Sequence, residues 1–273
     1  MPELPEVETV RRALQRHAAG LSVGSVRGHA VRLRLPLDVA GLRKRLPGRR
    51  LDGFRRRGKF LLLDLDPAGT LLVHLGMSGR LLLCDPSSPV LPHTHLTLGL
   101  GPVLELRFVD PRRFGLIEWL QPGDEASHPT LSALGIEPLD ERALRDLPPL
   151  LHVRRAPLKA LLLDQRLIAG VGNIYAAEAL WRAGIRPSRP GCRTALPRLE
   201  RLVGEVRAVL GEAVEQGGTT IRDFASPEGN FGDFAVRLQA YGHAGEPCPR
   251  CGDAMEDERL AGRSTVWCRR CQR

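Results

Sequence analysis

The stretch from Cys248-Pro-Arg-Cys251 to Cys268-Arg-Arg-Cys271 decides how the end of this chain folds. Two residues separate the cysteines of each pair, so a tight turn can direct both thiolates at one metal ion. The sixteen residues between the pairs suffice for one β-hairpin, which brings the second pair to the first. We therefore predict one structural zinc ion held by four cysteines. Two reducible disulfides are the alternative, but nothing else in the sequence is typical of a secreted protein.

The residues between the two cysteine pairs include Gly262-Arg263-Ser264-Thr265, which we expect to form the turn of the hairpin. This turn would carry the guanidinium of Arg263 away from the metal. A zinc ion with four cysteine ligands has no open position for water, so it organises structure and leaves chemistry to other residues.

The half of the chain before the cysteines has a helical hydrophobic period, clearest from residue 199 to residue 214 and closed by Gly217-Gly218. Two more helical patterns, at 158–167 and 174–183, flank the turn Gly170-Val-Gly-Asn173. With Asn173 as N-cap, the backbone N–H groups of the second helix are free to receive a phosphate. A helix cap with no further role is the alternative.

The N-terminal half differs in its pattern. Residues 5–19 predict a helix, with Pro5 at its first turn and Gly20 at its end. Short apolar runs then recur at 60–65, 71–75, 81–84, 96–100, 103–109 and 116–120, which favours a β-sandwich or barrel. Prolines and acids gather in residues 121–150, where we expect a hinge or linker between domains.

The charge of the chain favours a nucleic-acid partner. The formal net charge is +9 and the isoelectric point is near 9.9. Residues 43–59 contain nine basic residues and one acid, so much of the excess is local. No stretch reaches the eighteen apolar residues that a membrane span needs, and Glu3, Glu6 and Glu8 lie where a signal peptide has its apolar core. We expect a cytoplasmic protein.

Two features could carry chemistry. The chain has three lysines, Lys44, Lys59 and Lys159, beside 37 arginines, and an ammonium can release a proton near neutral pH where a guanidinium cannot. Lys59 begins a predicted strand and is the candidate for acid/base work. Removal of the initiator methionine would leave Pro2 with a free secondary amine beside the carboxyl of Glu3. An α-amino group is partly uncharged at neutral pH and can attack a sugar C1′.

Six motifs in order along the whole chain resemble those of the bacterial formamidopyrimidine-DNA glycosylases. They are Met1-Pro-Glu-Leu-Pro-Glu-Val-Glu-Thr9, His74-Leu-Gly-Met-Ser-Gly79, Asp110-Pro-Arg-Arg-Phe-Gly115, Gly170-Val-Gly-Asn-Ile-Tyr-Ala-Ala-Glu178, Gln216-Gly-Gly-Thr-Thr220 and the cysteine motif ending Cys271-Gln272. The related endonuclease VIII type begins Met-Pro-Glu-Gly-Pro-Glu, so Leu4 favours the formamidopyrimidine branch.

The resemblance implies a bifunctional DNA glycosylase and AP lyase of base excision repair. It implies that Pro2 attacks C1′ of the damaged nucleoside and forms a Schiff base, and that Glu3 is the acid that opens the sugar and releases the base. Lys59 then serves β-elimination at the 3′ side, and Arg263 assists δ-elimination at the 5′ side. The expected substrates are 8-oxoguanine opposite cytosine and ring-opened formamidopyrimidines.

The resemblance also implies which residues contact DNA. Met77, Arg112 and Phe114 match the residues that fill the void left by the flipped lesion, and their types suit that task. The implied phosphate contacts are His74, His93, Arg112, Arg154, Lys159 and Asn173, although Arg154 stands where the family often has lysine. The implied lesion-recognition loop includes Thr219, Thr220, Ile221 and Arg222. The pair His93-Thr-His95 could otherwise suggest a metal, but two ligands rarely suffice.

Taken together, we expect an α+β chain: a β-sandwich with a leading helix, then a helix-two-turn-helix domain ending in the four-cysteine zinc hairpin. The expected domains are 1–132, a hinge at 133–150, the helical domain at 151–238 and the hairpin at 239–273. We expect a monomer, associated with the nucleoid, that binds double-stranded DNA containing oxidised bases or abasic sites. An endonuclease VIII-like glycosylase for oxidised pyrimidines and a non-catalytic zinc-hairpin DNA-binding protein are the alternatives.

Overall fold

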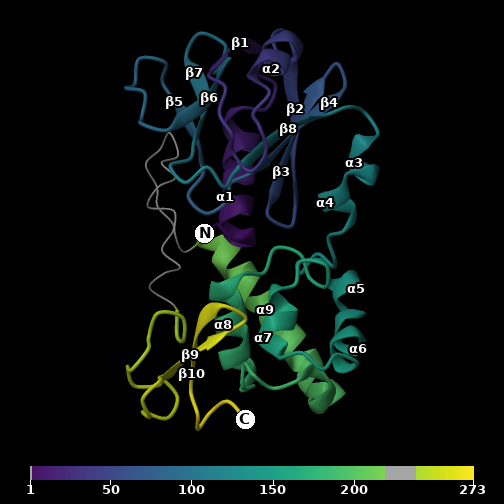
Figure 1. The fold of residues 1–273 in the computed structure, drawn as a ribbon, viewed down its shortest axis with the longest axis vertical. Coiled ribbons are helices and arrows are strands. Elements are labelled where there is room, and N and C mark those ends of the chain that lie inside the picture. The colour runs from purple at the N-terminus through teal and green to yellow at the C-terminus, as the bar shows by residue number, and fades with distance from the viewer. Residues whose placement is uncertain (1, 219–237) are drawn as a thin grey trace. The chain divides into compact units, whose positions relative to one another are not determined.

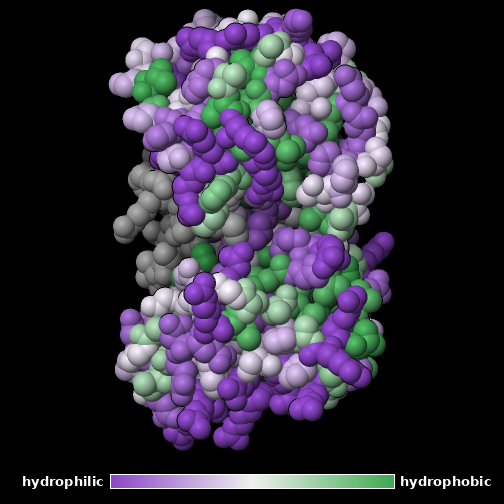
Figure 2. Space-filling view, in the orientation of Figure 1, coloured by the Kyte–Doolittle hydropathy of each residue, from purple (hydrophilic) through white to green (hydrophobic). Residues whose placement is uncertain are grey.

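The computed structural model describes residues 2–218 and 238–273, which form two compact units. The first unit contains residues 2–132 with 217 and 218, and the second contains residues 133–216 with 238–273. Figure 1 shows strands gathered in the N-terminal unit and helices in the other. On the face drawn in Figure 2, hydrophilic side chains cover most of the surface of each unit.

The first unit is a sandwich of two four-stranded antiparallel sheets, ordered β1-β6-β7-β5 and β2-β3-β4-β8. Its elements are α1 (Leu4–His17), β1 (Val23–Gly28), α2 (Val39–Arg45), β2 (Arg50–Arg57), β3 (Phe60–Asp66), β4 (Gly69–His74), β5 (Arg80–Cys84), β6 (Thr94–Leu100), β7 (Leu104–Val109), β8 (Leu116–Leu120), α3 (Asp124–Ser127) and α4 (Pro129–Ser132).

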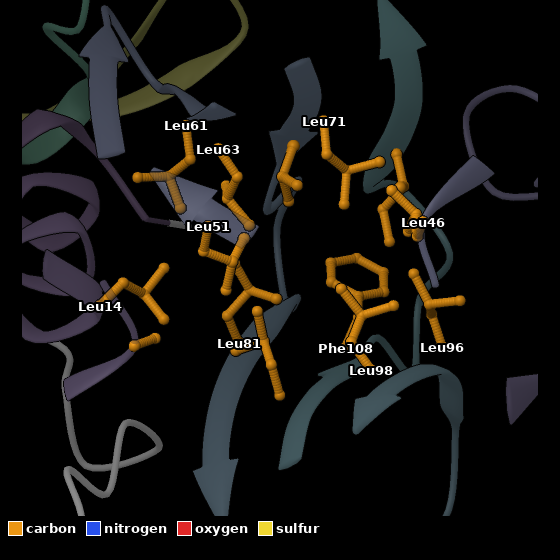
Figure 3. Packing of buried hydrophobic residues seen from close by; sticks show 14 of the residues in the cluster. Leu14, Leu46, Leu51, Leu61, Leu63, Leu71, Leu81, Leu96, Leu98 and Phe108 are labelled. Carbon is orange, nitrogen blue, oxygen red and sulfur yellow. The ribbon is translucent and has the colours of Figure 1, made fainter. Parts of the chain in front are cut away.

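The core of this unit lies between the two sheets. In Figure 3, Leu61, Leu63 and Leu71 from one sheet face Leu98 and Phe108 from the other. Alternate residues of a strand point to opposite faces, which is why residues two apart share this core. Helix α1 packs against β2 and adds its apolar stripe, including Leu14, to the same cluster. The helix that carries the N-terminus is therefore anchored to the sandwich.

Strands β1 and β2 and helix α2 were not predicted. β2 lies inside the basic run, and its two core residues, Leu51 and Phe54, are three apart instead of two. A register shift between Leu51 and Gly53 accounts for this spacing, because a β-bulge inserts an extra residue and lets both side chains face the core. The bulge removes the alternation by which a strand is found in a sequence.

The second unit is helical and ends in a hairpin. Its elements are α5 (Glu141–Leu144), α6 (Leu147–His152), α7 (Leu158–Leu163), α8 (Asn173–Ala183), a 3-10 turn (Gly191–Arg193), α9 (Leu196–Glu215), β9 (Glu256–Leu260) and β10 (Arg263–Trp267). Helix α8 is buried along almost its whole length and packs against α7, α9 and β10. The predicted fold class is confirmed: two β-sheets with a leading helix, a helical part and a C-terminal β-hairpin.

The segment 133–150, expected as a hinge, belongs to the second unit and contains α5 and the start of α6. Leu144, Leu147 and Leu151 from these helices are buried. Their spacing of three and four residues is helical, but it is hard to recognise from sequence in so short a run that also contains Pro148 and Pro149. Its role as a hinge remains a prediction.

Candidate active site, nucleic-acid interface and zinc site

The N-terminus begins with a buried carboxylate at a helix start. Glu3 is the N-cap of α1, and its side chain accepts a hydrogen bond from the backbone N–H of Glu6. In return the backbone N–H of Glu3 donates to Glu6 Oε2 at 2.8 Å. This reciprocal pair is a capping box, and both side chains are almost completely buried. It fixes the carboxyl of Glu3 next to Pro2, and the spacing Glu3-x-x-Glu6 could have been recognised in the sequence.

Gly218, three residues beyond the end of α9, lies against the carboxylate of Glu6. Its φ is +82°, and a Cβ placed on it would lie 2.9 Å from Glu6 Oε1. Only glycine fits such an approach without displacement. The chain therefore passes directly beside Glu6 just before the predicted lesion loop. Thr219, Thr220, Ile221 and Arg222 lie outside the described residues.

Glu178 anchors residues 239–241, which follow the predicted lesion loop in the sequence. This carboxylate is fully buried in α8 and accepts hydrogen bonds from the backbone N–H groups of residues 239–241, at 2.9 Å from Ala240 and 2.8 Å from Tyr241. A buried charge is stable only where such donors replace its water. Glu178 ends the motif that begins at Gly170, but nothing in the sequence alone indicates this anchoring role.

Lys59 lies in the two-residue turn between β2 and β3, after Gly58 with φ of 56°, and is largely buried. Arg56 ties this turn to α1, because it donates to Gly58 O at 2.9 Å and to Glu8 Oε2 at 3.2 Å. Burial raises the pKa of Glu8, but hydrogen bonds and charges from Arg11, Arg56 and Arg12 outweigh burial and lower it. Glu8 thus remains an anion that holds the Lys59 turn.

His74 ends β4 with its ring buried and packed on Phe60, with ring centroids 4.7 Å apart. Its Nδ1 accepts from the backbone N–H of Gly76 at 2.9 Å and lies 3.2 Å from Arg34 Nη2. Burial, and then the charges of Arg34 and Lys59, lower its pKa to about 3. The imidazole is therefore neutral, and with Nδ1 as acceptor its Nε2 carries the proton and can donate.

Met77, Arg112 and Phe114 come together on two adjacent loops. The apolar side chains are 39% and 46% exposed, respectively, and Arg112 lies over the Phe114 ring at 5.0 Å. They line a cavity of about 590 Å³ together with Arg32, Leu33, Arg34, Gly76 and Arg113. Exposed apolar side chains beside guanidinium groups suit unstacked bases and phosphates.

Asp110 shapes these loops and was not singled out in the sequence. It is completely buried, and its two oxygens accept from Ser78 Oγ and from the backbone N–H of Gly115, each at 2.8 Å. One carboxylate thus joins the loop that carries Met77 to the loop that carries Phe114. An acid at the head of Asp-Pro-Arg-Arg-Phe-Gly, with a glycine five residues on, was the signal available.

His93 and His95 do not share a face. His93 is exposed with φ of 65°, and β6 begins after it, whereas His95 is buried with Nε2 at 2.9 Å from Asp110 O. A register shift between Thr94 and Leu96 breaks the alternation. His93 therefore lies at the surface beside the Asp110 loop, as a phosphate contact requires.

In the second unit, Asn173 is the first residue of α8 and Gly172 is the N-cap, one residue earlier than predicted. Asn173 Nδ2 donates to Ser264 O of β10 at 3.1 Å. Arg154 is exposed. Lys159, which we expected to contact a phosphate, is instead fully buried, with its Nζ 2.8 Å from Ser264 O.

The hairpin turns at Ala261-Gly262, with φ of 51° and 73°. The predicted turn began one residue later, and Arg263 is the first, exposed residue of β10. Two consecutive residues with positive φ make the tight turn that matches the twist of a hairpin. The guanidinium of Arg263 thus leaves the strand immediately beyond the turn.

The four cysteines gather at the end of the hairpin opposite this turn, before β9 and after β10. Their sulfur atoms all lie within 4.8 Å of one another, with Cys251 and Cys268 at 3.5 Å and Cys248 and Cys271 at 3.9 Å. Zinc–sulfur bonds of about 2.3 Å in a tetrahedron place the sulfurs about 3.8 Å apart, so this cluster fits zinc. Arg250, between the first two cysteines, donates to Trp181 O and Arg182 O and attaches the site to the end of α8.

Family models match three successive parts of the chain. The formamidopyrimidine-DNA glycosylase N-terminal domain matches residues 1–117, the H2TH domain of the same enzymes matches 134–225, and the zinc finger found in FPG and IleRS matches 245–273. The chain belongs to the formamidopyrimidine-DNA glycosylase family. The four cysteines are accordingly the ligands of one structural zinc, as predicted.

Full-length relatives agree with this family. The chain is 48% identical over 274 residues to formamidopyrimidine-DNA glycosylase from Acidithiobacillus ferrooxidans, with all of both chains covered. The crystal structure of MutM (Fpg) from Thermus thermophilus is 43% identical, with a TM-score of 0.86 over 99% of this chain and 98% of that one. Lactococcus lactis Fpg in complex with DNA containing N7-benzyl-Fapy-dG is 33% identical, with a TM-score of 0.91 over 99% of both chains. Among the described residues no helix is long and apolar enough to cross a membrane.

Proposed function

We propose that this family member excises oxidised purines from double-stranded DNA and then cleaves the strand. Its proposed substrates are 8-oxoguanine opposite cytosine and ring-opened formamidopyrimidines. The observation that supports this most strongly is the match to formamidopyrimidine-DNA glycosylases over the full length, in a chain whose Pro2 directly precedes the buried, capped carboxyl of Glu3. We propose that the protein acts as a monomer on the nucleoid, with the domain boundaries expected from the sequence.

The proposed reaction begins at Pro2. Its secondary amine, once Met1 has been removed, attacks C1′ and displaces the base, which leaves with the electrons of the glycosidic bond and takes up a proton. Glu3 protonates the sugar ring oxygen as the ring opens, which converts the C1′ adduct to an iminium ion. The capping box supports this role, because it holds the Glu3 carboxyl in one place next to the nucleophile.

Two eliminations follow in the proposed sequence. The iminium makes the C2′ proton acidic, so its removal expels the 3′ phosphate, and Lys59 serves this step. A second proton loss expels the 5′ phosphate with help from Arg263. The tether from Glu8 through Arg56 to Gly58 supports the role of Lys59, since it joins the lysine's turn to the helix that begins beside Pro2.

Met77, Arg112 and Phe114 are proposed to fill the void when the lesion leaves the stack, with the Arg112 guanidinium on the orphaned cytosine. Their clustering around one cavity supports this assignment. His74, His93, Arg112, Arg154 and Asn173 are proposed to contact phosphates. We propose that the segment with Thr219, Thr220, Ile221 and Arg222 closes over the lesion.

Strand cleavage of matched duplexes tests the substrate class. One duplex carries 8-oxoguanine opposite cytosine and the other carries thymine glycol opposite adenine, with the purified full-length protein in excess. We expect the 8-oxoguanine strand to be cut much faster, leaving phosphates at both ends of a one-nucleotide gap. Faster cutting at thymine glycol contradicts the proposed substrate, and no cutting of either duplex contradicts the proposed activity.

A further inference from the structure

Lys159 is a buried lysine whose ammonium faces the strand that carries Arg263. It lies in α7 with no exposed surface, and its Nζ donates to Ser264 O at 2.8 Å and to Thr265 Oγ1 at 2.7 Å. An ammonium loses its hydration on burial, which is costly unless acceptors replace the water. Here the replacements are on the two residues that follow Arg263. A side chain enclosed in this way does not reach a phosphate.

The Thr265 hydroxyl carries this contact one residue closer to the turn. Thr265 is also fully buried, and its Oγ1 donates to Arg263 O at 3.1 Å while it accepts from Lys159. A hydroxyl has one proton and two lone pairs, so both bonds can exist at once. Lys159 is thus connected to the carbonyls of Arg263 and Ser264.

A second donor meets the same strand. Asn173 Nδ2, at the start of α8, donates to Ser264 O at 3.1 Å, and this carbonyl has lone pairs for both donors. A two-stranded hairpin is only marginally stable by itself in water. The direction in which Arg263 leaves β10 therefore depends on contacts from outside the hairpin, and Lys159 and Asn173 supply them from two helices.

We propose that Lys159 is a positioning residue for Arg263 and that it acts through the backbone of residues 263–265. This inference rests on the proposed function, in which Arg263 assists δ-elimination. Without the buried ammonium, Ser264 O and Thr265 Oγ1 lose the donor that fixes residues 263–265. The guanidinium of Arg263 is then no longer held against the 5′ phosphate. A displacement of about 1 Å can slow a step about 100-fold. The δ step is the one affected, since Pro2, Glu3 and Lys59 belong to the other unit.

The test compares the two elimination steps in the zinc-loaded, full-length protein. Lys159→Met keeps the length of the side chain and removes every donor. On a 5′-labelled duplex with one abasic site, the β product, with an unsaturated aldehyde end, separates on a gel from the δ product, with a 3′ phosphate. We expect the δ rate to fall by about 10-fold or more, with the β rate and the yield of borohydride adduct within about 2-fold of the parent.

A second variant guards against loss of folding. Thr265→Val removes only the hydroxyl that links Lys159 to Arg263 O. It should also lower the share of δ product, but by less than Lys159→Met does. Thr194→Val is its matched control, since Thr194 is also buried in this unit but its hydroxyl donates to Pro190 O, at 3.0 Å. The control should keep the product ratio of the parent.

Other results overturn the proposal. If Lys159→Met keeps the parent's product ratio but weakens DNA binding with a salt slope smaller by about one, Lys159 contacts a phosphate. If Lys159→Met loses zinc, the result for Thr265→Val is used instead. An unchanged ratio of β to δ product in that variant refutes the proposed positioning of Arg263. Absence of a borohydride adduct with the parent protein refutes the proposed function instead, so the two failures are distinguishable.

Discussion

The neutral His74 should make the stability of the N-terminal unit depend on pH. Burial, with Arg34 and Lys59 nearby, lowers its pKa from 6.5 to about 3. The unfolded chain therefore takes up a proton below about pH 6.5, whereas the folded chain takes one up only near pH 3. Between these values the unfolded state binds more protons, so the free energy of unfolding falls as the pH falls.

The magnitude follows from the size of the shift. Each pKa unit corresponds to about 1.4 kcal/mol, so the full shift is worth about 5 kcal/mol, and about 2 kcal/mol of it is lost by pH 5. His74→Asn removes the titration and leaves an oxygen that can accept from the Gly76 N–H. The variant also loses the contact with Phe60, which lowers its stability by a similar amount at every pH.

The measurement is urea unfolding of both proteins at pH 7.5 and pH 5, followed by hydrogen exchange in peptides from β3 and β4. These peptides report on the N-terminal unit alone, so a release of zinc from the other unit by acid does not affect the reading. The parent should lose about 2 kcal/mol more than the variant between the two pH values. Equal losses in the two proteins would show that the folded state does not hold His74 neutral.

Three further predictions concern zinc, phosphate and the approach to Glu6. Cys251→Ser should release zinc, whose binding supplies roughly 10 kcal/mol or more in such sites. The hairpin should then unfold and tight DNA binding should be lost, while the β-sandwich stays folded. Metal analysis and hydrogen exchange check this, and a zinc-free variant with normal DNA binding contradicts it. Arg154→Ala should weaken binding to every DNA sequence alike and reduce the slope of log K against log salt by about one, an expectation that an unchanged slope in fluorescence anisotropy refutes. Gly218→Ala places a methyl 2.9 Å from Glu6 Oε1 at φ of +82°. It should therefore destabilise the N-terminal unit by more than about 1 kcal/mol and slow base excision. Gly211→Ala, in an open helical position, is the control and should neither destabilise that unit nor slow excision.

The sequence was most informative where a regular period or a fixed ligand spacing determines structure. The helices α8 and α9, the strands from β3 to β8 and the cysteine site follow from such patterns. β2 was not predicted because its bulge shifts the core residues to a spacing of three and because four arginines, an aspartate and a glycine fill the remaining positions. Helices α5 and α6 escaped because each is barely longer than one turn.

The site shows the same division. The sequence pointed to Pro2 and Glu3 through a family motif, to Lys59 through the scarcity of lysine, and to Arg263 through the hairpin turn. Glu3 is supported by the nearby Glu6, but Lys59 and Arg263 are supported by contacts between residues far apart in the sequence. Arg56 meets Glu8 across 48 positions, and Lys159 meets Thr265 across 106. Such contacts depend on tertiary folding and leave no local pattern. For that reason the sequence gives no sign that Lys159 is buried against β10.

The central claim is that Pro2 forms a covalent iminium with a damaged nucleotide. Sodium borohydride adds a hydride to the iminium carbon and makes the bond permanent, so protein and labelled DNA migrate together on a denaturing gel. With an 8-oxoguanine duplex we predict one adduct, whose peptide map places the DNA on Pro2. A variant that retains a residue before Pro2 should give none. Absence of an adduct in the processed protein, or an adduct on a lysine, would contradict the account.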